Sequence, residues 1–538
     1  MRVLLRCDGG GSLGVGHVMR SLALAEAAVA AGHEVLVAGR FEGAFLERQL
    51  RAAPVEVVRL ASPSPGGGQG PGSGLPEPLE RFLPDVVHID SYDLSGWLPG
   101  SFVLSNIEDG TFGRRRADVV VDPTFGAELS PRPQDGSGWL LRGSRYTPVR
   151  RRVVDARRRG PIHDAARSVL VVMGGTDPVG LAPGAVQLLA RTGLALEVVV
   201  IAVGENARRV RAAADGSALS LSVLAPVDDL ASLMYASDLV ISAAGTTIWE
   251  LCCLGVPTAA VWAVDNQREG YAQVVAAGAA IGLGGPGLGD DERAADLLAR
   301  TLADPRLRDA LAAAGRRVVD GLGAWRVVRM WETAQLQRVP GGPAPIDTAA
   351  LTVRPATAQD SRQLWQWRND PVTRSGSRSS AEVSWDDHER WLAQTLTRTD
   401  RLLLIVDDQD GAVGTVRWDL VTEPAGGNQP EGESRRAEDD VEIDSQRQQD
   451  LEWEVSITVA PRRRGQSLAS ALLRAGEEAL LAGTQPGTGG RPGVAAYLAV
   501  VHRDNRASVR LFESSGYVPD LPPDPHGFVR YRKTARVP

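Results

Sequence analysis

The fold of the N-terminal half is decided by residues 3–17, VLLRCDGGGSLGVGH, a short apolar run that leads into a glycine-rich turn. The apolar periodicity that follows predicts a helix from His17 to Ala31, which Gly32 ends, and a second strand over residues 34–38. Strands that alternate with helices are typical of a parallel sheet covered by helices.

A second series of strands and helices follows the arginine-rich stretch at residues 150–159. The sequence therefore predicts an α/β fold with two Rossmann-like domains, over residues 1–150 and 160–335, and a ligand cleft between them. The strands of the second series are expected at residues 168–172, 198–203, 239–241 and 257–261.

The glycine-rich turn is the first candidate site. Gly14 and Gly16 stand directly before a helix start, where glycine lets backbone N–H groups approach an anion closely. His17 is then expected at the carboxyl edge of the sheet, where open α/β folds bind ligands and where a histidine can take a proton near neutral pH. The alternative interpretation is a tight packing turn with an incidental surface histidine.

A second candidate site lies in the second domain, where polar turns follow three successive strands. Glu250 falls early in the helix after the second turn and can accept hydrogen bonds from ribose hydroxyls. Asn266 and Gln267 supply neutral donors and acceptors at the next strand end. Ordinary turns are the alternative, but three of them together favour a nucleotide pocket. The residues expected to bind the nucleotide sugar are Gly14, Gly16, Gly174, Gly175, Thr176, Ser242, Gly245, Thr246, Glu250 and Gln267.

Composition limits the possible classes of function. The chain has 538 residues and a formal net charge of −7, which argues against a dedicated nucleic-acid-binding protein. No apolar run is long enough to span a bilayer, and residues 1–8 lack the apolar core of a signal peptide, so we expect a cytoplasmic protein without a membrane partner. The three cysteines have no metal-ligand spacing, so we expect buried thiols and no metal site. Lys533 is the only lysine, which excludes a phosphate-loop lysine.

The pattern changes after a Pro/Gly-rich linker predicted at residues 336–350, and residues 351–538 are expected to form a third domain. Within it, residues 402–406 and 412–418 predict a hairpin, and residues 452–459 alternate as a strand. Residues 421–450 predict a disordered acidic insertion, because nine acidic and three basic residues lie between residues 423 and 450.

The strand at residues 452–459 leads into residues 461–469, PRRRGQSLA, and then into a predicted helix. Such a turn suits a pyrophosphate held by backbone N–H groups at a helix start, with arginine nearby. Taken alone, the arginines indicate only a solvated basic turn. Glu454 on this strand is a candidate base, although glutamates on a strand face are often only solvated.

The first 335 residues resemble the UDP-2,4-diacetamido-2,4,6-trideoxy-β-L-altropyranose hydrolases of pseudaminic acid biosynthesis. The resemblance rests on residues 8–27 (DGGGSLGVGHVMRSLALAEA), 88–94 (HIDSYDL), 171–178 (VVMGGTDP) and 241–267 (ISAAGTTIWELCCLGVPTAAVWAVDNQ). It implies a glycosyltransferase-B fold, with UDP held mainly by the second domain, and inverting hydrolysis at the anomeric carbon.

This resemblance also implies roles for single residues. His17 matches the catalytic histidine that acts on the attacking water, and Tyr92 and Asn266 match other active-site positions. Glu250 matches the acidic residue that binds the nucleotide ribose. Two opposed carboxylates would not be needed, because UDP is already a good leaving group.

The third domain resembles the GNAT superfamily of N-acetyltransferases, which implies acetyl-CoA as cosubstrate. The coenzyme loop of that superfamily reads R-G-x-G-x-(G/A); Arg464, Gly465 and Ala469 match it, whereas Ser467 replaces the middle glycine. Phe512 stands where many members have the tyrosine that protonates the departing thiolate, so that role stays unassigned. The residues expected to bind acetyl-CoA are Val459, Arg464, Gly465, Gln466, Ser467, Leu468, Ala469, Asn505 and Ser508.

Residues 367–370, WRND, are similar to the acetyltransferase of the same pathway, which acts on the 4-amino group of a UDP-linked amino sugar, and to enzymes that acetylate protein N-termini. The two resemblances together imply a bifunctional enzyme that acetylates a UDP-4-amino-sugar and then hydrolyses the product to UDP and free sugar. Two alternatives remain at this stage. The first half would transfer its sugar to an acceptor other than water, or the last domain would act on another amine or be a non-catalytic binding module.

Overall fold

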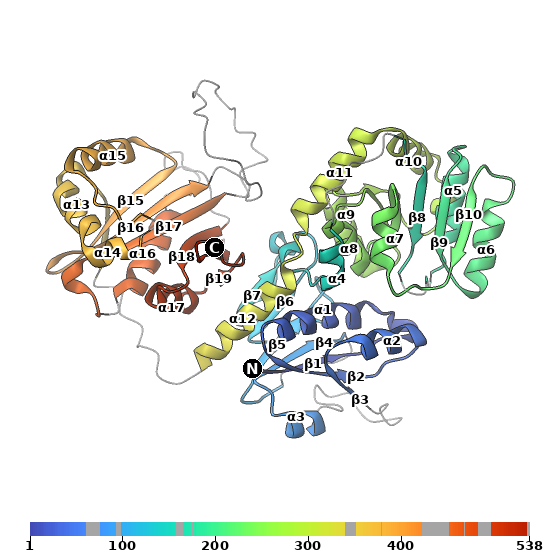
Figure 1. Ribbon diagram of the computed structural model, residues 1–538, viewed down its shortest axis with the longest axis horizontal. Helices are drawn as coiled ribbons and strands as arrows, with labels where there is room; N and C mark the ends of the chain where they lie inside the picture. Colours follow the sequence, from blue (N-terminus) through green and yellow to red (C-terminus); the bar gives the residue numbers. More distant parts are fainter. Residues whose placement is uncertain are drawn as a thin grey trace. The chain divides into compact units, whose positions relative to one another are not determined.

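The computed structural model describes residues 1–60, 76–92, 98–157, 165–174, 177, 179–338, 351–377, 379–421, 451–466, 468–482 and 496–534. The chain divides into two compact units, Met1–Leu336 and Gln337–Pro538. Both units are built from strands and helices (Figure 1). The acidic stretch from residue 422 to residue 450, and residues 339–350 of the expected linker, lie outside the described residues.

Unit 1 contains a first sheet of seven parallel strands in the order β3-β2-β1-β4-β5-β6-β7. Its central strands are almost wholly buried, because helices cover the sheet and the strand residues are mostly aliphatic. The strands are β1 Arg2–Cys7, β2 Glu34–Gly39, β3 Glu56–Arg59, β4 Val86–Asp90, β5 Val103–Ile107, β6 Val119–Asp122 and β7 Trp139–Arg142. The helices are α1 Gly16–Ala30, α2 Ala44–Ala52, α3 Pro76–Phe82 and α4 Arg151–Ala156.

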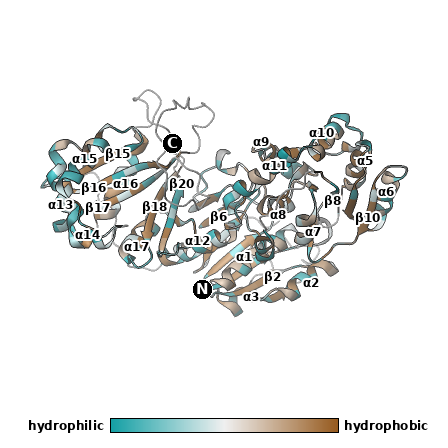
Figure 2. Cartoon of the chain, turned by 45° about the horizontal axis from the view of Figure 1, so that its top comes forward, coloured by the Kyte–Doolittle hydropathy of each residue, from teal (hydrophilic) through white to brown (hydrophobic). Residues whose placement is uncertain are grey.

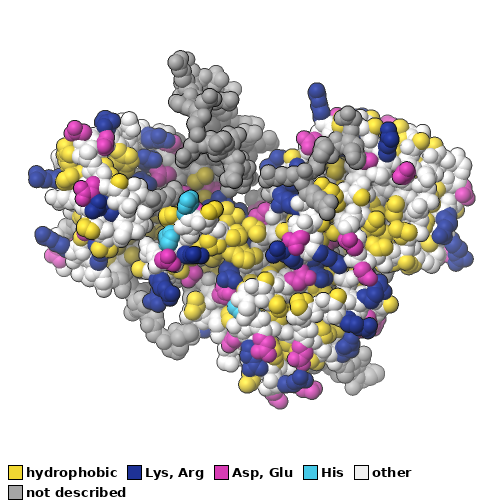
Figure 3. All heavy atoms as spheres, viewed as in Figure 1, with side chains coloured by type: hydrophobic (Ala, Val, Ile, Leu, Met, Phe, Trp, Pro, Cys, Tyr) yellow, Lys and Arg dark blue, Asp and Glu magenta, His cyan; other side chains and the backbone are white. Residues whose placement is uncertain are grey.

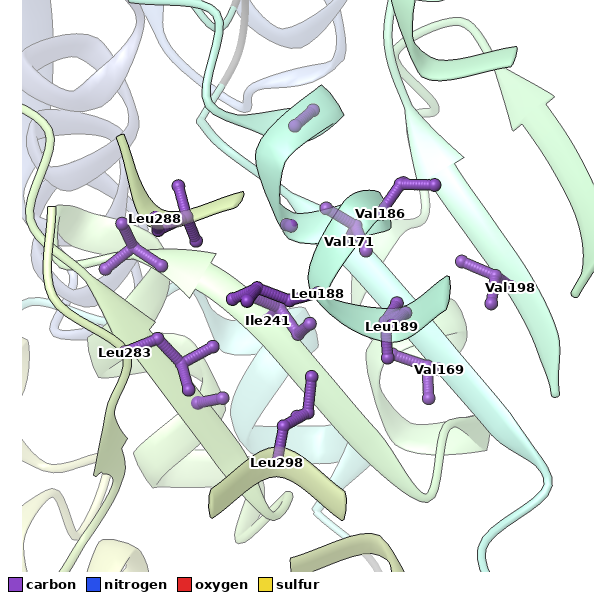
Figure 4. Close-up of a cluster of buried hydrophobic side chains, with 14 of the residues drawn as sticks. Val169, Val171, Val186, Leu188, Leu189, Val198, Ile241, Leu283, Leu288 and Leu298 are labelled. Carbon is purple, nitrogen blue, oxygen red and sulfur yellow. The ribbon is translucent and has the colours of Figure 1, made fainter. Parts of the chain in front are cut away.

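The second sheet of unit 1 has six parallel strands in the order β10-β9-β8-β11-β12-β13. Figure 4 shows part of its core, in which side chains of β8, β9 and β11 pack against leucines of the covering helices. The strands are β8 Ser168–Val172, β9 Glu197–Ile201, β10 Ser220–Leu224, β11 Leu239–Ala243, β12 Thr258–Val261 and β13 Ile281–Gly282. The helices are α5 Ala182–Arg191, α6 Gly204–Ala214, α7 Leu230–Ala236, α8 Thr246–Leu254, α9 Arg268–Ala276, α10 Glu292–Ala303, α11 Pro305–Val318 and α12 Gly323–Arg338.

Helix α12 follows the second sheet in sequence but packs against the first. The indole Nε1 of Trp331 donates to the hydroxyl of Ser105 on β5 at 2.9 Å, and both side chains are fully buried. Arg326 donates to the carbonyl of Arg145 at 2.7 Å. The last helix of unit 1 therefore ties the two Rossmann-like domains together, and it continues to Arg338, past residue 336 where the linker was expected to begin.

Unit 2 contains a seven-stranded sheet in the order β14-β15-β16-β17-β18-β20-β19, in which only the β17–β18 pair is parallel. Helix α16 packs on one face, with Val416, Trp418 and Trp453 in the core, and α13 and α15 pack near the other, with Leu403 and Ile405. The strands are β14 Thr352–Pro355, β15 Arg401–Asp408, β16 Gly411–Val421, β17 Glu452–Val459, β18 Ala496–His502, β19 Val518–Pro519 and β20 Phe528–Thr534. The helices are α13 Ser361–Asn369, α14 Pro371–Ser375, α15 Trp385–Thr397, α16 Leu468–Ala482 and α17 Arg506–Ser514.

These elements confirm the predicted α/β fold class. The glycine turn joins a strand to a helix as expected, residues 168–172 form β8, and the two halves of the predicted hairpin pair as β15 and β16. Hydropathy follows the same layers, with hydrophobic residues concentrated in the strands and on the helix faces that cover them (Figure 2). On the face drawn in Figure 3, basic and acidic side chains are interspersed. None of the helices in the described ranges is long and apolar enough to cross a membrane.

Candidate active sites

His17 lies at the start of α1 and meets Asp90 at the end of β4. Because β1 and β4 are neighbours, with Cys7 opposite Asp90, the helix that follows β1 begins beside the last residue of β4. The Nδ1 atom of His17 lies 2.5 Å from Oδ1 of Asp90. Both residues are buried, and His17 keeps 9% of its surface exposed. The glycine turn thus places the histidine at the carboxyl edge of the sheet, as the sequence predicts.

Asp90 also holds Arg20, which lies one helical turn after His17. Arg20 donates to both oxygens of Asp90 at 2.6 and 2.7 Å. Burial opposes the ionisation of Asp90, but the charges of Arg20 and His17 outweigh it and keep the pKa of Asp90 well below its usual range. An ionised carboxylate can only accept a hydrogen bond, so Nδ1 of His17 carries a proton in either charge state, and in the neutral imidazole Nε2 is the nitrogen that keeps its lone pair.

Arg20 extends this network to Tyr92. Its Nη1 atom donates to the carboxylate of Asp109 at 2.7 and 2.9 Å, and the Tyr92 hydroxyl donates to the same carboxylate. Burial and the Asp109 charge raise the pKa of Tyr92 far above its usual value, so this hydroxyl stays protonated. The rings of His17 and Tyr92 meet edge to face, with centroids 4.6 Å apart. The predicted catalytic residues His17 and Tyr92 therefore lie together.

Asn266, from the second sheet of unit 1, reaches the same network. It belongs to the short helix η4, Asp265–Gln267, which follows β12. Its Nδ2 atom lies 3.5 Å from the Tyr92 hydroxyl, and its Oδ1 is buried without a hydrogen-bond partner among the described residues. The structure thus brings together all three catalytic residues predicted for the first site.

The starts of two helices also lie close to each other beside His17. A Cβ atom placed on Gly16, the first residue of α1, would lie 3.3 Å from the side chain of Thr246, the first residue of α8. The N-termini of both helices carry unsatisfied N–H groups and partial positive charge, which favour an anion such as a phosphate. Neither Gly10, at the glycine turn, nor Gly174, after β8, can be replaced without strain, because both have positive φ.

The remaining residues predicted to bind the nucleotide sugar divide into three groups. Gly245 precedes α8, and the side chain of Gln267 packs against it. A Cβ atom added to Gly245 would lie 3.4 Å from Nε2 of Gln267, and Oε1 of Gln267 accepts from the Ala263 N–H at 2.9 Å. Ser242 lies inside β11 rather than in the turn, and its buried hydroxyl donates to a backbone carbonyl. Gly175 and Thr176 lie outside the described residues.

Glu250 is the fifth residue of α8 and lies near two arginines of the connector between the domains. Burial raises the pKa of Glu250 to about 7, and the charges of Arg152 and Arg150 only partly offset this effect. A carboxyl group with this pKa changes its charge near neutrality, so its hydrogen bonds to a ribose would depend on pH.

In unit 2, the strands that flank the expected coenzyme site part from each other. The paired ladder between β17 and β18 ends at Val455 and Ala499, although the strands continue to Val459 and His502. Among the described residues, the backbone of residues 456–459 therefore has no ladder partner on the β18 side. Unpaired strand groups of this kind suit the extended amide chain of a pantetheine arm.

The coenzyme loop follows directly. Arg464 pairs with Asp370 at 2.6 Å and donates to the Thr373 hydroxyl at 2.7 Å, so the WRND segment holds this loop. Gly465 has a φ of 77°, and a Cβ there would meet nothing within 4 Å, which leaves open space beside the backbone. The loop leads to Leu468 and Ala469 at the start of α16, where N–H groups are available for a pyrophosphate.

The other predicted coenzyme residues also occupy helix starts and turns. Asn505 caps α17 by accepting from the N–H of Ser508 at 3.2 Å. Gln466 accepts from the Nε of Arg463 at 2.9 Å, and Ser467 lies outside the described residues. Glu454 lies on β17 opposite Asp419, on the sheet face away from α16.

Phe512 packs in the core between Tyr517 and Tyr531, with ring centroids 5.0 and 6.5 Å away. Tyr517 donates to Glu477 in the buried interior at 2.9 Å. Neither residue is placed to protonate a thiolate.

Sequence reasoning missed Asp90, Arg20 and Asp109. A signal existed for two of them: Arg20 follows His17 by three residues, which puts both on one helix face, and Asp90 ends a buried strand inside the HIDSYDL segment. Asp109 lies in a turn after β5, and only the folded chain brings it to Arg20. Among the described residues, no three His, Cys, Asp or Glu side chains are grouped as a metal site.

Two protein-family models match separate parts of the chain. Residues 169–285 match the glycosyltransferase family 28 C-terminal domain, and residues 350–518 match the acetyltransferase (GNAT) domain. The chain carries a nucleotide-sugar glycosyltransferase-type domain and a GNAT acetyltransferase domain. Its architecture is that of two parallel α/β domains, the second of which contains the glycosyltransferase family 28 match, followed by the part that matches the GNAT domain.

Three individual proteins illustrate the similarity. The spore coat polysaccharide biosynthesis protein SpsG of Bacillus subtilis is 25% identical over 233 residues, which are 41% of this chain and 67% of that protein. An uncharacterized protein of Methanocaldococcus jannaschii is 18% identical over 432 residues, 75% of this chain and 80% of that protein. The crystal structure of Acinetobacter baumannii MurG covers 62% of this chain and 99% of its own, at 18% identity and a TM-score of 0.44.

Proposed function

We propose that this GNAT–glycosyltransferase-B chain acetylates the amino group of a UDP-linked 4-amino-sugar and then hydrolyses the acetylated UDP-sugar to UDP and a free diacetamido sugar. The observation that carries the hydrolytic half is the contact between His17 and Asp90 at 2.5 Å, next to two converging helix starts. A histidine whose Nδ1 is held by a buried carboxylate offers Nε2 as a general base beside a site suited to phosphate.

In the proposed hydrolysis, Nε2 of His17 takes a proton from water as the water oxygen bonds to the anomeric carbon. The bond from that carbon to the UDP oxygen breaks on the opposite face, and its electron pair leaves with UDP, so the configuration is inverted. The helix starts at Gly16 and Thr246 stabilise the charge that develops on the diphosphate. The Asp90 carboxylate stabilises the imidazolium that forms.

In the proposed acetylation, acetyl-CoA supplies the acetyl group. Glu454 accepts a proton from the sugar amine, directly or through water, while the amine nitrogen bonds to the thioester carbon and the bond from that carbon to sulfur breaks. The departing thiolate takes a proton from solvent, since Phe512 carries no proton to give.

Two similarities support placing both steps in polysaccharide or sugar biosynthesis. SpsG, which is similar to part of the chain, is a spore coat polysaccharide biosynthesis protein. The alignment with the Methanocaldococcus jannaschii protein covers 75% of the chain, more than the 336 residues of unit 1, so it includes residues of both units. An alignment that extends across both units supports treating them as parts of one enzyme.

The test is mass spectrometry of the products formed from UDP-4-amino-4,6-dideoxy-β-L-AltNAc with and without acetyl-CoA. We expect UDP and a diacetamido sugar only when acetyl-CoA is present, and an acetylated UDP-sugar that accumulates in the His17→Ala variant. In water enriched in ¹⁸O, the label should enter the sugar and not UDP. Label in UDP would contradict attack at the anomeric carbon.

A second candidate function is sugar transfer to an acceptor other than water. The match of residues 169–285 to a glycosyltransferase domain favours it. An acetylated UDP-sugar that stays intact in water, but loses UDP when an acceptor sugar or lipid is added, would establish transfer and exclude hydrolysis.

A further inference from the structure

Three arginines gather on the face of the unit 2 sheet that lies away from α16. Arg417 of β16 stands between Val416 and Trp418, which pack into the core on the α16 side, so its own side chain points to the opposite face. Its guanidinium lies 5.9 Å from the ring centroid of Trp391 on α15. Arg368 of α13, which packs on this face, lies close enough to Arg374 of α14 and to Arg417 for their charges to act on it. The arginine cluster consists of Arg368, Arg374 and Arg417.

Arg368 and Arg374 are each held along one edge of the guanidinium group. Arg368 donates through Nη2 to the carbonyl of Ser379 at 2.9 Å, and Arg374 donates through Nη1 to the carbonyl of Ser380 at 3.4 Å. Arg374 also pairs at 3.3 Å with Glu382, whose side chain is 73% exposed. Nη1 of Arg368 and Nε of Arg374 are buried and have no hydrogen-bond partner among the described residues. Such donors are unfavourable unless an acceptor binds them.

The charges around Arg368 also favour a bound anion. Burial lowers the pKa of Arg368, and the positive charges of Arg374 and Arg417 lower it further. Asp419 of β16 is shared between two arginines, since it accepts from Arg417 at 2.8 Å and also pairs with Arg401. Half-buried cations that repel one another favour a bound anion.

The cluster lies beside the candidate base. Glu454 pairs in register with Asp419, and Arg417 pairs with Ser456, so Arg417 and Glu454 are diagonal neighbours on one sheet face. Diagonal neighbours across antiparallel strands are about 7–8 Å apart. A pyranose ring spans a comparable distance from an amino group on one side to a diphosphate on the other.

The cluster also adjoins the coenzyme loop. Arg464 of that loop holds Asp370 and Thr373, which lie in the chain between Arg368 and Arg374. At the end of α14, a Cβ on Gly376 would lie 3.2 Å from Nδ2 of Asn505, a residue expected to bind coenzyme. An acceptor held by the cluster would therefore present its amine next to the acetyl donor.

We infer that the arginine cluster binds the diphosphate group of a nucleotide-linked amino sugar and so selects an anionic acceptor for the acetyltransferase domain. This inference rests on the proposed function, whose acetylation step it makes specific. Planar guanidinium groups bind phosphate oxygens through paired hydrogen bonds, and lysine is absent from this face because the chain has only Lys533. A polycationic acceptor such as a polyamine would be repelled.

The experiment measures acetyl transfer by the full chain to UDP-4-amino-4,6-dideoxy-β-L-AltNAc and to the same amino sugar without UDP. The variants are Arg368→Gln and Arg417→Gln, and Arg390→Gln is the matched control, because Arg390 is 73% exposed on α15 and pairs with Asp387. We expect the KM for the UDP-sugar to rise about 10- to 100-fold in the cluster variants. The KM for acetyl-CoA and the rate with the sugar that lacks UDP should change less than about twofold.

Other outcomes would overturn the inference. A rise in the KM for acetyl-CoA would mean that the cluster binds coenzyme phosphates, and an equal loss with both sugars would mean that the arginines are only structural. Better acetylation of spermidine than of the UDP-sugar would show a cationic acceptor.

A binding measurement separates failure of the inference from failure of the proposed function. Pyrophosphate is titrated calorimetrically into the wild-type chain and into Arg368→Gln. Unit 1 is unchanged between the two proteins, so the difference between their isotherms reports on the cluster alone. Loss of one pyrophosphate site in the variant supports the anion site even if this particular sugar is not acetylated, and identical isotherms contradict it.

Discussion

At the scale of single residues, the Asp90 carboxylate decides which nitrogen of His17 is free to act. Because Asp90 is ionised and only accepts, it fixes the proton on Nδ1 and leaves Nε2 as the base. The Asp90→Asn variant presents an amide that can donate to Nδ1 instead, which would move the proton to Nε2. We expect kcat for UDP release to fall about 10³- to 10⁴-fold, with little change in KM.

This prediction is checked by measuring UDP release from the acetylated UDP-sugar, with thermal unfolding as a test of folding. Asp135→Asn is the matched control, because Asp135 pairs with Arg132 and does not touch His17. An Asp90→Asn protein that keeps more than about a tenth of the wild-type kcat would show that His17 is not the base.

Glu250 provides a second residue-scale prediction, on pH. Burial raises its pKa to about 7, so folding favours the protonated carboxyl, and the stability from this group is lost as the pH rises from the ordinary value near 4.5 through 7. A ribose hydroxyl donates best to the ionised form. We therefore expect the contribution of Glu250 to UDP affinity to disappear as the pH falls below 7 and the carboxyl group becomes protonated.

The measurement compares the Kd for UDP of two proteins: the single variant Arg368→Gln, which keeps Glu250, and the double variant that also carries Glu250→Gln. The Arg368→Gln change is present in both so that binding at the arginine cluster of unit 2 is suppressed. Titration of the UDP phosphate affects both proteins equally. The ratio of the two Kd values should be about ten at pH 8 and approach one at pH 6. A ratio that does not change with pH would show that Glu250 makes no contact with the ribose.

The sequence predicts which residues come together where they are close along the chain or at neighbouring strand ends. The places of His17 and of the α8 start could be expected, because a helix that follows a strand of a parallel sheet begins at the carboxyl edge of that sheet. The Arg20–Asp109 pair could not, because it joins residues 89 positions apart whose meeting depends on how α1 and the turn after β5 pack. Ser242 was expected in the turn because the strand was expected to end at residue 241, whereas β11 continues for two more residues to Ala243.

At the scale of elements, α12 stabilises the first sheet of unit 1 through one buried polar contact. Trp331 donates to the Ser105 hydroxyl, and Nδ1 of His88 lies 2.9 Å from the same hydroxyl. Burial lowers the pKa of His88 to about 4, so the histidine is neutral in the fold. That α12 packs against the first sheet, although it follows the second sheet in sequence, could not be predicted from the local pattern. A helical period shows which face of a helix is buried but not which sheet covers that face.

A pH effect on stability follows from the neutral His88. Between pH 6.5 and 4 the unfolded chain binds a proton at this position that the folded chain does not, so unit 1 loses about 3 kcal/mol of unfolding free energy on acidification. In His88→Phe this loss should be absent. Urea unfolding at pH 7 and pH 4.5, followed by tryptophan fluorescence, gives the difference. His526→Phe is the control and should lose stability like the wild type, because His526 is exposed in unit 2.

At the scale of the whole molecule, the two proposed reactions belong to units with separate cores. Residues 339–350, between the end of α12 at Arg338 and Leu351, lie outside the described residues. Joining two units in one chain raises the local concentration of one near the other, but does not by itself pass a product between them. We therefore expect the acetylated UDP-sugar to be released into solvent before it is hydrolysed.

Mixing two defective chains tests this expectation. His17→Ala retains acetylation, and Gly465→Val retains hydrolysis but cannot form the coenzyme loop, because a β-branched residue is strained at a φ of 77°. Equal amounts of the two chains, given the UDP-amino-sugar and acetyl-CoA, should release UDP after a lag and then reach about half the wild-type rate, because half of the chains carry each working site. The lag should shorten as the protein concentration rises. The expectation would be wrong if the mixture acetylated the sugar but never released UDP, while the wild-type chain released UDP without a lag. That result would show that the intermediate is passed within a single chain.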